Sequence, residues 1–144
     1  MPTSVALEIF DNLHAFMHLC RTRMRSGLEA ANPELTFNEA RVLMHTGRHP
    51  GLSHKDLIER SHTDKAQMTR LLATLEARGW LTRTPSEDDK RVRCLHLSPQ
   101  GEQLVQQLLT VQRQVMEELL QPLPPALQQA LLEGLQRANT AEVD

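Results

Sequence analysis

Apolar residues recur every three or four positions along most of the chain, which is the spacing of one face of an α-helix. The first such run predicts a long helix over residues 4–31, with apolar positions at Leu7, Phe10, Leu13, Met17, Cys20, Met24 and Leu28. Pro33 ends this helix, because proline lacks an amide donor and restricts the residue before it. Further runs predict helices over residues 36–45, 53–60, 63–79 and 98–121, and a last helix that carries Leu127, Leu131 and Leu135.

Three of the predicted helices begin with capping residues. Thr36 followed by Glu39 is the pattern of a capping box, in which each side chain binds the other residue's amide. Ser53 followed by Asp56 repeats this pattern at the third helix. Thr63 is expected to cap the fourth helix.

A hairpin is predicted over residues 80–97. Segment 85–90 has turn composition, and segment 91–97 alternates in the way of a strand. Leu95 and Leu97 are expected to face the core, which leaves Cys94 on the outer side. A short helix, a short turn, a second helix and a hairpin form a winged helix-turn-helix, so the fold class is mainly α with a small β-hairpin wing.

The segments that flank this unit hold much of the apolar surface. Residues 35–98 are expected to form the winged helix-turn-helix domain, and residues 1–34 and 99–144 a helical dimerisation region. Pairing of two copies through the flanking helices would bury their apolar faces and present two fourth helices to successive major-groove faces. We therefore expect a homodimer.

The composition is that of a folded, mostly helical domain. Hydrophobic residues make up 40% and charged residues 24% of the chain, while aromatic residues reach only 3% and tyrosine is absent. The net charge is −2, but residues 53–97 carry 9 Lys/Arg against 7 Asp/Glu, and three of these acids cluster at 87–89. A small cationic patch on a neutral body suits a reader of duplex DNA.

Three segments carry a resemblance to a known family: LTFNEARVL (35–43), DKAQMTRLLATLEARGWLTR (64–83) and DDKRVRCLHLSPQG (88–101). Over roughly residues 5–140 the chain resembles the multiple-antibiotic-resistance regulator (MarR) family of bacterial transcription factors. The resemblance implies a homodimer on a pseudo-palindromic operator, usually a repressor released by a small ligand or by oxidation. It also implies that Arg91 enters the minor groove and that Asp89 holds its guanidinium.

Candidate DNA contacts lie on the fourth helix, at the start of the third helix and on the wing. They are Ser53, Thr63, Lys65, Gln67, Thr69, Arg70, Arg83, Asp89, Lys90 and Arg91. Gln67 is the best candidate for base readout because its amide can pair with adenine, while Lys65 and Ser53 suit phosphate. The alternative for the helix residues is an ordinary solvated face.

A candidate effector pocket lies between the dimerisation helices and the DNA-binding domain. Its proposed lining is His14, Met17, His18, Arg21, Met44 and His45. Methionine supplies an adaptable apolar wall, and histidine or arginine can hold an anionic aromatic ligand. The alternative is that these are plain core or surface residues.

Metal-responsive or redox-responsive regulation is an alternative to a small-molecule effector. His14 and His18 lie one helical turn apart and could bind a divalent metal, but Gly47 is expected to end the second helix before His49, which argues against a His45–His49 pair. Cys20 invites comparison with family members that sense peroxide through a cysteine tied to tyrosines, which this chain lacks. We expect neither a metal nor a cofactor.

Other functional classes find little support in the sequence. No Ser/His/Asp or Cys/His set and no glycine-rich phosphate loop is recognisable, so an enzyme is not expected. A winged-helix module that binds protein rather than DNA remains an alternative. No apolar run approaches the roughly 18 residues of a membrane span, and we expect a cytoplasmic protein whose partners are duplex operator DNA, a second copy and a small-molecule effector.

Overall fold

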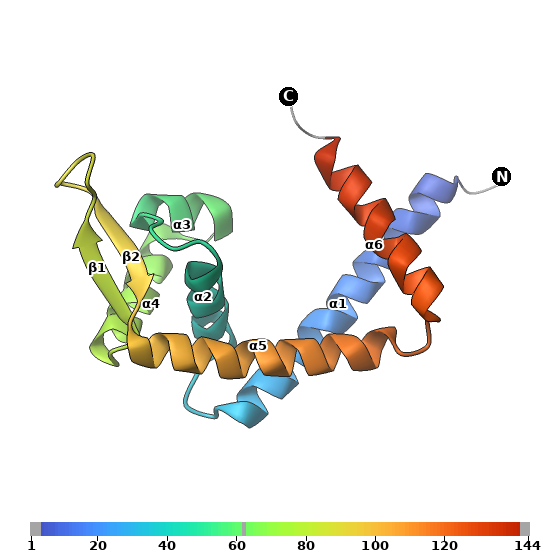
Figure 1. The fold of residues 1–144 in the computed structure, drawn as a ribbon, viewed down its shortest axis with the longest axis horizontal. Helices are drawn as coiled ribbons and strands as arrows, with labels where there is room; N and C mark the ends of the chain where they lie inside the picture. The colour runs from blue at the N-terminus through green and yellow to red at the C-terminus, as the bar shows by residue number, and fades with distance from the viewer. Residues whose placement is uncertain (1–3, 62, 142–144) are drawn as a thin grey trace.

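A computed structural model describes residues 4–61 and 63–141. The elements are α1 (Val5–Ala31), α2 (Phe37–Arg48), α3 (His54–Ser61), α4 (Lys65–Ala77), β1 (Leu81–Pro85), β2 (Arg93–Leu97), α5 (Pro99–Leu120) and α6 (Pro125–Thr140). Helices α2 to α4 and the β1–β2 hairpin form a lobe, from which α5 runs to α6 and the first half of α1 (Figure 1). The predicted mainly helical winged helix-turn-helix is confirmed. None of the described helices is both long and apolar enough to cross a membrane.

Both predicted capping boxes are present. The Glu39 amide donates to Thr36 Oγ1 over 3.1 Å, and the Thr36 amide donates to Glu39 Oε1 over 2.9 Å. At α3 the Asp56 amide donates to Ser53 Oγ over 3.1 Å, and the Ser53 amide donates to Asp56 Oδ2 over 3.0 Å. Each box satisfies amides that have no partner inside the helix.

The expected end of α2 at Gly47 is wrong. The helix continues to Arg48, and the His49 amide donates to the His45 carbonyl over 3.0 Å. Gly47 serves packing instead, because a Cβ atom there would lie 3.0 Å from Leu97 Cδ1 and 3.3 Å from a methyl group of Val105. The missing side chain allows α2 to approach β2 and α5 closely.

The expected cap of α4 by Thr63 is also wrong. The Thr63 hydroxyl donates to the Ser61 carbonyl over 3.4 Å, and Asp64 stands at the N-cap without a side-chain cap bond. The negative charge of Asp64 still favours the positive end of the helix dipole. At the other end of α4, Gly79 adopts a φ of 79°, which lets the chain turn into β1.

The hairpin joins the segment before α3 to the rest of the lobe. Strands β1 and β2 are antiparallel with Arg83 opposite Leu95, and the Leu95 amide donates to the Leu52 carbonyl over 2.8 Å. Leu95 is buried as predicted, and Leu97 packs against the core while remaining partly exposed. Cys94 is half-buried rather than fully outside, because it forms a bridge to Ser53.

The hydrophobic core lies in the lobe and extends into the long helices. The largest fully buried side chains are Leu43, Leu57, Met68, Leu72, Leu75, Leu95 and Leu108. Leu28 of α1 and Leu104 and Val105 of α5 join the same cluster. The core therefore reaches beyond residues 35–98 on both sides, so α1 and α5 help to stabilise the lobe.

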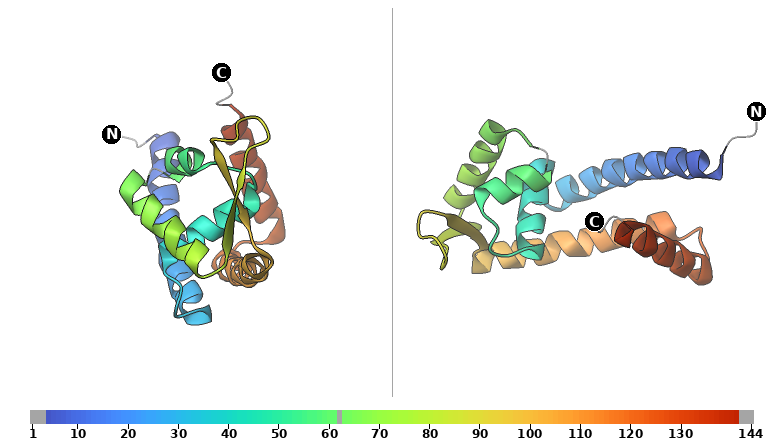
Figure 2. Two further views of the ribbon diagram at one scale, coloured as in Figure 1. Left: turned by 90° about the vertical axis from the view of Figure 1, so that its left-hand side faces the viewer. Right: turned by 90° about the horizontal axis from the view of Figure 1, so that it is seen from above.

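The N-terminal part of α1 and helix α6 each expose an apolar face. These residues are Val5, Leu7, Ile9, Phe10, Leu13, Met17 and Leu19 on α1, and Leu127, Leu131, Leu132 and Leu135 on α6. Both segments extend away from the lobe (Figure 2), and no described residue of α6 is buried. Soluble domains rarely leave so continuous an apolar surface uncovered.

The start of α5 packs directly on the turn between α4 and β1. The Ser98 amide donates to the Trp80 carbonyl over 2.9 Å, and Ser98 Oγ accepts from the Gly101 amide over 3.0 Å while its hydroxyl donates to the Gly79 carbonyl. A Cβ atom on Gly101 would lie 2.1 Å from the Trp80 carbonyl oxygen. Only glycine allows this contact, because the obstructing atom belongs to the backbone.

We expect Gly101→Ala to lower the free energy of unfolding by about 3 kcal/mol or more, since the new methyl group would force α5 away from Trp80. Urea unfolding at fixed chain concentration measures the change. Gln103→Ala is the control at an exposed position of α5 two residues further along, where the change should stay within about 0.5 kcal/mol. Equal stability of both variants would contradict the packing described at this turn.

Candidate nucleic-acid interface

Helix α4 has one buried and one exposed face. Met68, Leu72 and Leu75 are fully buried. The exposed face carries the predicted DNA contacts Lys65, Gln67, Thr69 and Arg70. Helix α4 follows α3 after a short turn, so its exposed polar face can enter a major groove without disturbing the core.

The tip of the wing holds an arginine against an aspartate. Asp89 Oδ1 accepts the Arg91 amide over 3.0 Å and lies 3.4 Å from Arg91 Nε. The Arg91 side chain is 92% exposed, so its terminal nitrogens remain open to a ligand. A carboxylate that holds one edge of a guanidinium limits its rotation, which lowers the entropy cost of inserting it into a groove.

Arg83 has a bracing contact that sequence reasoning missed. Its Nε donates to Glu76 Oε1, and both side chains are about two-thirds buried, at 30% and 31% exposure. The ion pair joins β1 to α4. The wing is thereby tied to the helix whose exposed face carries the candidate contacts.

His54 is a second residue that sequence reasoning missed. Its Nε2 lies 3.3 Å from Thr69 Oγ1, and the Thr69 hydroxyl donates to the Lys65 carbonyl over 2.8 Å. His54 must therefore be the donor to Thr69, which links the start of α3 to α4. Burial lowers the pKa of His54, and the positive charges of Arg83 and Lys65 lower it further. No local sequence pattern indicates this pair, because its members are fifteen residues apart.

Ser53 and Thr63 are half-buried at the two ends of α3. Ser53 Oγ accepts the Asp56 amide, which leaves its hydroxyl proton free to donate to a phosphate. The Thr63 hydroxyl is occupied by the Ser61 carbonyl. Lys90 is exposed beside Arg91 on the wing.

The structure brings two of the six predicted pocket residues together. Met44 and His45 line a cavity of about 540 Å³ between α2, α3 and α4, here called the α2–α4 cavity. The other four, His14, Met17, His18 and Arg21, are exposed on α1 and do not line it in the single chain. The cavity lining is Asn38, Arg41, Val42, Met44, His45, Arg48, Leu57, Arg60, Ser61, Thr63, Asp64, Gln67, Met68, Leu71 and Gln112.

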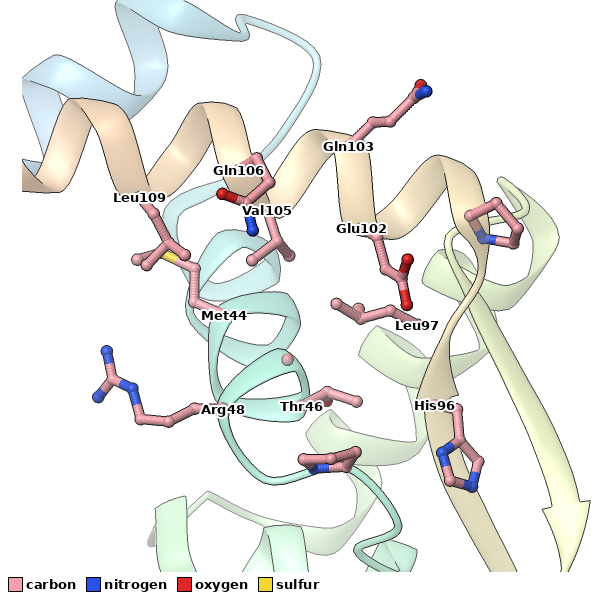
Figure 3. A pocket seen from close by; sticks show the side chains of 13 residues that line it. Met44, Thr46, Arg48, His96, Leu97, Glu102, Gln103, Val105, Gln106 and Leu109 are labelled. Carbon is pink, nitrogen blue, oxygen red and sulfur yellow. The ribbon is translucent and has the colours of Figure 1, made fainter.

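A second, open hollow of about 740 Å³ lies between the end of α2, strand β2 and the start of α5. Figure 3 shows Leu97, Val105 and Glu102 projecting into it. Met44 lines it as well as the α2–α4 cavity. The remaining predicted pocket residues lie elsewhere.

The sequence model of the MarR family matches residues 34–92, which span α2 to the wing tip. The transcriptional regulator HosA of Escherichia coli is 32% identical over 88 residues, which cover 61% of this chain and 65% of HosA. The lobe of this chain therefore resembles the MarR family in sequence. The match thus spans somewhat less than two thirds of the HosA relative.

Solved structures agree with this assignment at the level of the fold. The transcriptional regulator BldR of Sulfolobus solfataricus superposes with a TM-score of 0.74 at 21% identity, covering 94% of this chain and 95% of BldR. FabT of Streptococcus pneumoniae in complex with DNA also gives a TM-score of 0.74, at 18% identity over 94% and 95% of the two chains. The likeness in fold to these structures therefore extends beyond the lobe and over nearly the whole chain.

The histidines and the cysteine behind the metal and redox alternatives lie apart from the candidate DNA contacts in sequence. Within residues 4–61 and 63–141, no three His, Cys, Asp or Glu side chains gather in a way that could hold a metal ion. The expected separation of His49 from His45 is wrong, because their ring centroids lie 4.9 Å apart at the end of α2. Cys20 is buried, and burial raises the pKa of its thiol, which disfavours the reactive thiolate.

We expect His54→Gln to reduce the loss of stability on acidification. Because the pKa of His54 is lowered in the folded chain, the unfolded chain binds more protons as the pH falls below 6.5, and this favours unfolding. Urea unfolding at pH 7.5 and 5.5 measures the effect, with His14→Gln on the exposed face of α1 as the control. A variant that loses as much stability as the parent chain would refute the role assigned to His54.

Proposed function

We propose that the protein is a DNA-binding transcriptional regulator that acts as a homodimer in the cytoplasm and is not an enzyme. The observation that carries this proposal is the wing, where Asp89 holds the exposed guanidinium of Arg91. The match of residues 34–92 to the MarR family supports it, as does the fold shared with FabT, whose structure was solved in complex with DNA. The overall charge of −2 is compatible, because the candidate contacts form a local cationic patch.

A second copy of this chain is the proposed occupant of the exposed apolar faces. Leucine-rich surface on α6 and the first half of α1 lies on the side away from the lobe. Two-fold pairing would bury this surface and present both α4 helices to one side of a duplex. The operator would then be a pseudo-palindrome, with half-sites about 10 base pairs apart.

We further propose repression that a small organic anion relieves. The α2–α4 cavity supports this choice, because it places three arginines near residues of α4. An oxidation switch fits less well with the buried Cys20 and the absence of tyrosine. A protein-binding module without DNA affinity is the remaining alternative, and selection of duplexes from a random pool by the full-length protein separates it from a DNA reader.

We expect Arg91→Ala to weaken binding to the selected duplex by roughly tenfold or more, since it removes a groove contact worth about 1–3 kcal/mol. Asp89→Ala should weaken binding less, and it should cost nothing further in the Arg91→Ala background, because Asp89 acts through Arg91. Fluorescence anisotropy at fixed salt measures these affinities. Arg137→Ala at the far end of α6 is the charge-matched control.

Near-parental affinity of Arg91→Ala would overturn the assignment of the wing to DNA. Full additivity of the two substitutions would show that Asp89 contacts DNA, or acts, independently of Arg91. Dimer mass measured for each variant excludes a loss that arises from assembly.

We expect Lys65→Ala and Gln67→Ala to affect DNA binding in different ways. Loss of the Lys65 phosphate contact should weaken all duplexes alike and reduce the slope of log affinity against log salt by about one unit per protomer. Loss of the Gln67 amide should instead reduce discrimination between selected and scrambled duplexes while leaving the slope unchanged. Titrations at several salt concentrations distinguish the two, and identical behaviour of the variants would reject these separate roles.

A further inference from the structure

The imidazole of His45 lies in the wall of the α2–α4 cavity. Its Nε2 is buried, and among the described residues no donor or acceptor binds it. A buried polar atom without a partner costs stability unless a ligand or another group satisfies it. The atom therefore marks a position at which a bound molecule would gain a hydrogen bond.

Positive charge surrounds this position. Arg41 and Arg48 on α2 and Arg60 on α3 line the cavity, and His49 packs against the His45 ring. Among the described residues of the lining, the one acidic residue is Asp64 at the start of α4, and α5 contributes the neutral Gln112. Such a lining repels a metal cation and attracts an anion.

The rest of the lining defines the body of the ligand. Val42, Met44, Leu57, Met68 and Leu71 supply apolar wall, and the volume of about 540 Å³ accommodates a single ring with its substituents. An inorganic anion would leave this wall uncovered. An organic anion with one charged group and an apolar body matches both parts of the lining.

The protonation of His45 responds to such a ligand. Burial lowers the pKa of His45, and the charges of His49, Arg60, Arg48 and Arg41 lower it further. The ring is therefore neutral at pH 7. A carboxylate placed at Nε2 reverses this balance, because an opposite charge at hydrogen-bond distance favours the imidazolium.

We propose that the α2–α4 cavity binds an organic monoanion together with one proton, which the His45 imidazole takes from solvent so that Nε2–H donates to the ligand's carboxylate. This inference rests on the proposed regulation by a small anion and specifies its chemistry. Asp64 and Gln67 of α4 line the same cavity, so the ligand occupies space beside the start of the candidate DNA-reading helix. Acidification would strengthen the response to the ligand.

Calorimetric titration of the full-length, DNA-free protein with benzoate tests the proposal. Benzoate remains ionised between pH 5.5 and 8.0, since carboxyl groups of this kind titrate near pH 4. We expect the association constant to rise roughly tenfold as the pH falls over this range. The titration is repeated in buffers of different ionisation enthalpy, which measures how many protons the complex takes up, and we expect a value approaching one. The neutral analogue benzamide should bind more weakly than benzoate.

His45→Gln separates hydrogen bonding from proton uptake. Glutamine can still donate a hydrogen bond from its side chain, but it cannot titrate, so affinity should remain measurable while the pH dependence and the proton uptake disappear. His14→Gln on the exposed face of α1 should leave both unchanged. The proton count on the unaltered protein needs no variant, so misfolding of His45→Gln would not obscure the test.

The outcomes separate this inference from the proposed function. Saturable benzoate binding without proton uptake, proton uptake that persists in His45→Gln, or no binding of benzoate at pH 5.5 each overturns the inference. DNA binding is measured on separate samples by anisotropy. Benzoate binding with proton uptake but without DNA binding would support the inference and refute the proposed regulator. DNA binding together with benzoate binding that does not depend on pH would support the regulator and refute the inference.

Discussion

The contact between the first turn of α5 and the Trp80 carbonyl links the parts of this protein that must act together. Gly101 has no side chain there, Ser98 caps the helix, and Gly79 turns the chain from α4 into β1. Helix α5 then runs to the far end of the molecule and packs on α1, where Gly27 lies against Val111. The direction of α5 relative to α4 and the wing is thereby fixed by backbone contact, which is stiffer than side-chain packing.

Two side-chain contacts also join the wing and α3 to α4. The Arg83–Glu76 ion pair holds the wing to α4, and the His54–Thr69 hydrogen bond holds α3 to it. With the contact at Trp80, these contacts join the candidate DNA-reading surface to the start of α5. In the proposed dimer, small changes at the outer helices would alter the separation of two such surfaces, and a ligand in the α2–α4 cavity would act on the same surface from within.

Much of the fold could be predicted from local patterns, because its helices begin with capping residues whose partners lie three positions away. Thr36 with Glu39 and Ser53 with Asp56 are pairs of this kind, and Asp89 and Arg91 on the wing lie only two positions apart. Predictions failed where the role of a residue depends on contacts with an element that is distant in sequence. Gly47 reads as a helix end, but it is small because Leu97 and Val105 approach it.

The candidate site also contains residues that local sequence patterns predict and residues whose roles depend on distant partners. The exposed face of α4 follows from helical periodicity, whereas Glu76 and His54 could not be found, since their partners are distant in sequence. The predicted pocket set joined residues of α1 to Met44 and His45, but the single chain separates them. The arginines of the α2–α4 cavity come from two helices, and their convergence depends on how α2 and α3 pack.

The central claim is that two copies of this chain read one duplex, at a spacing set by α1, α5 and α6. The mass of the protein–DNA complex in solution, measured with a duplex that carries an inverted pair of selected half-sites and with one that carries a single half-site, tests this most directly. The account predicts two chains of 16.4 kDa on the paired duplex and much weaker binding to the single half-site. One chain per duplex, with equal affinity for both duplexes, would contradict it.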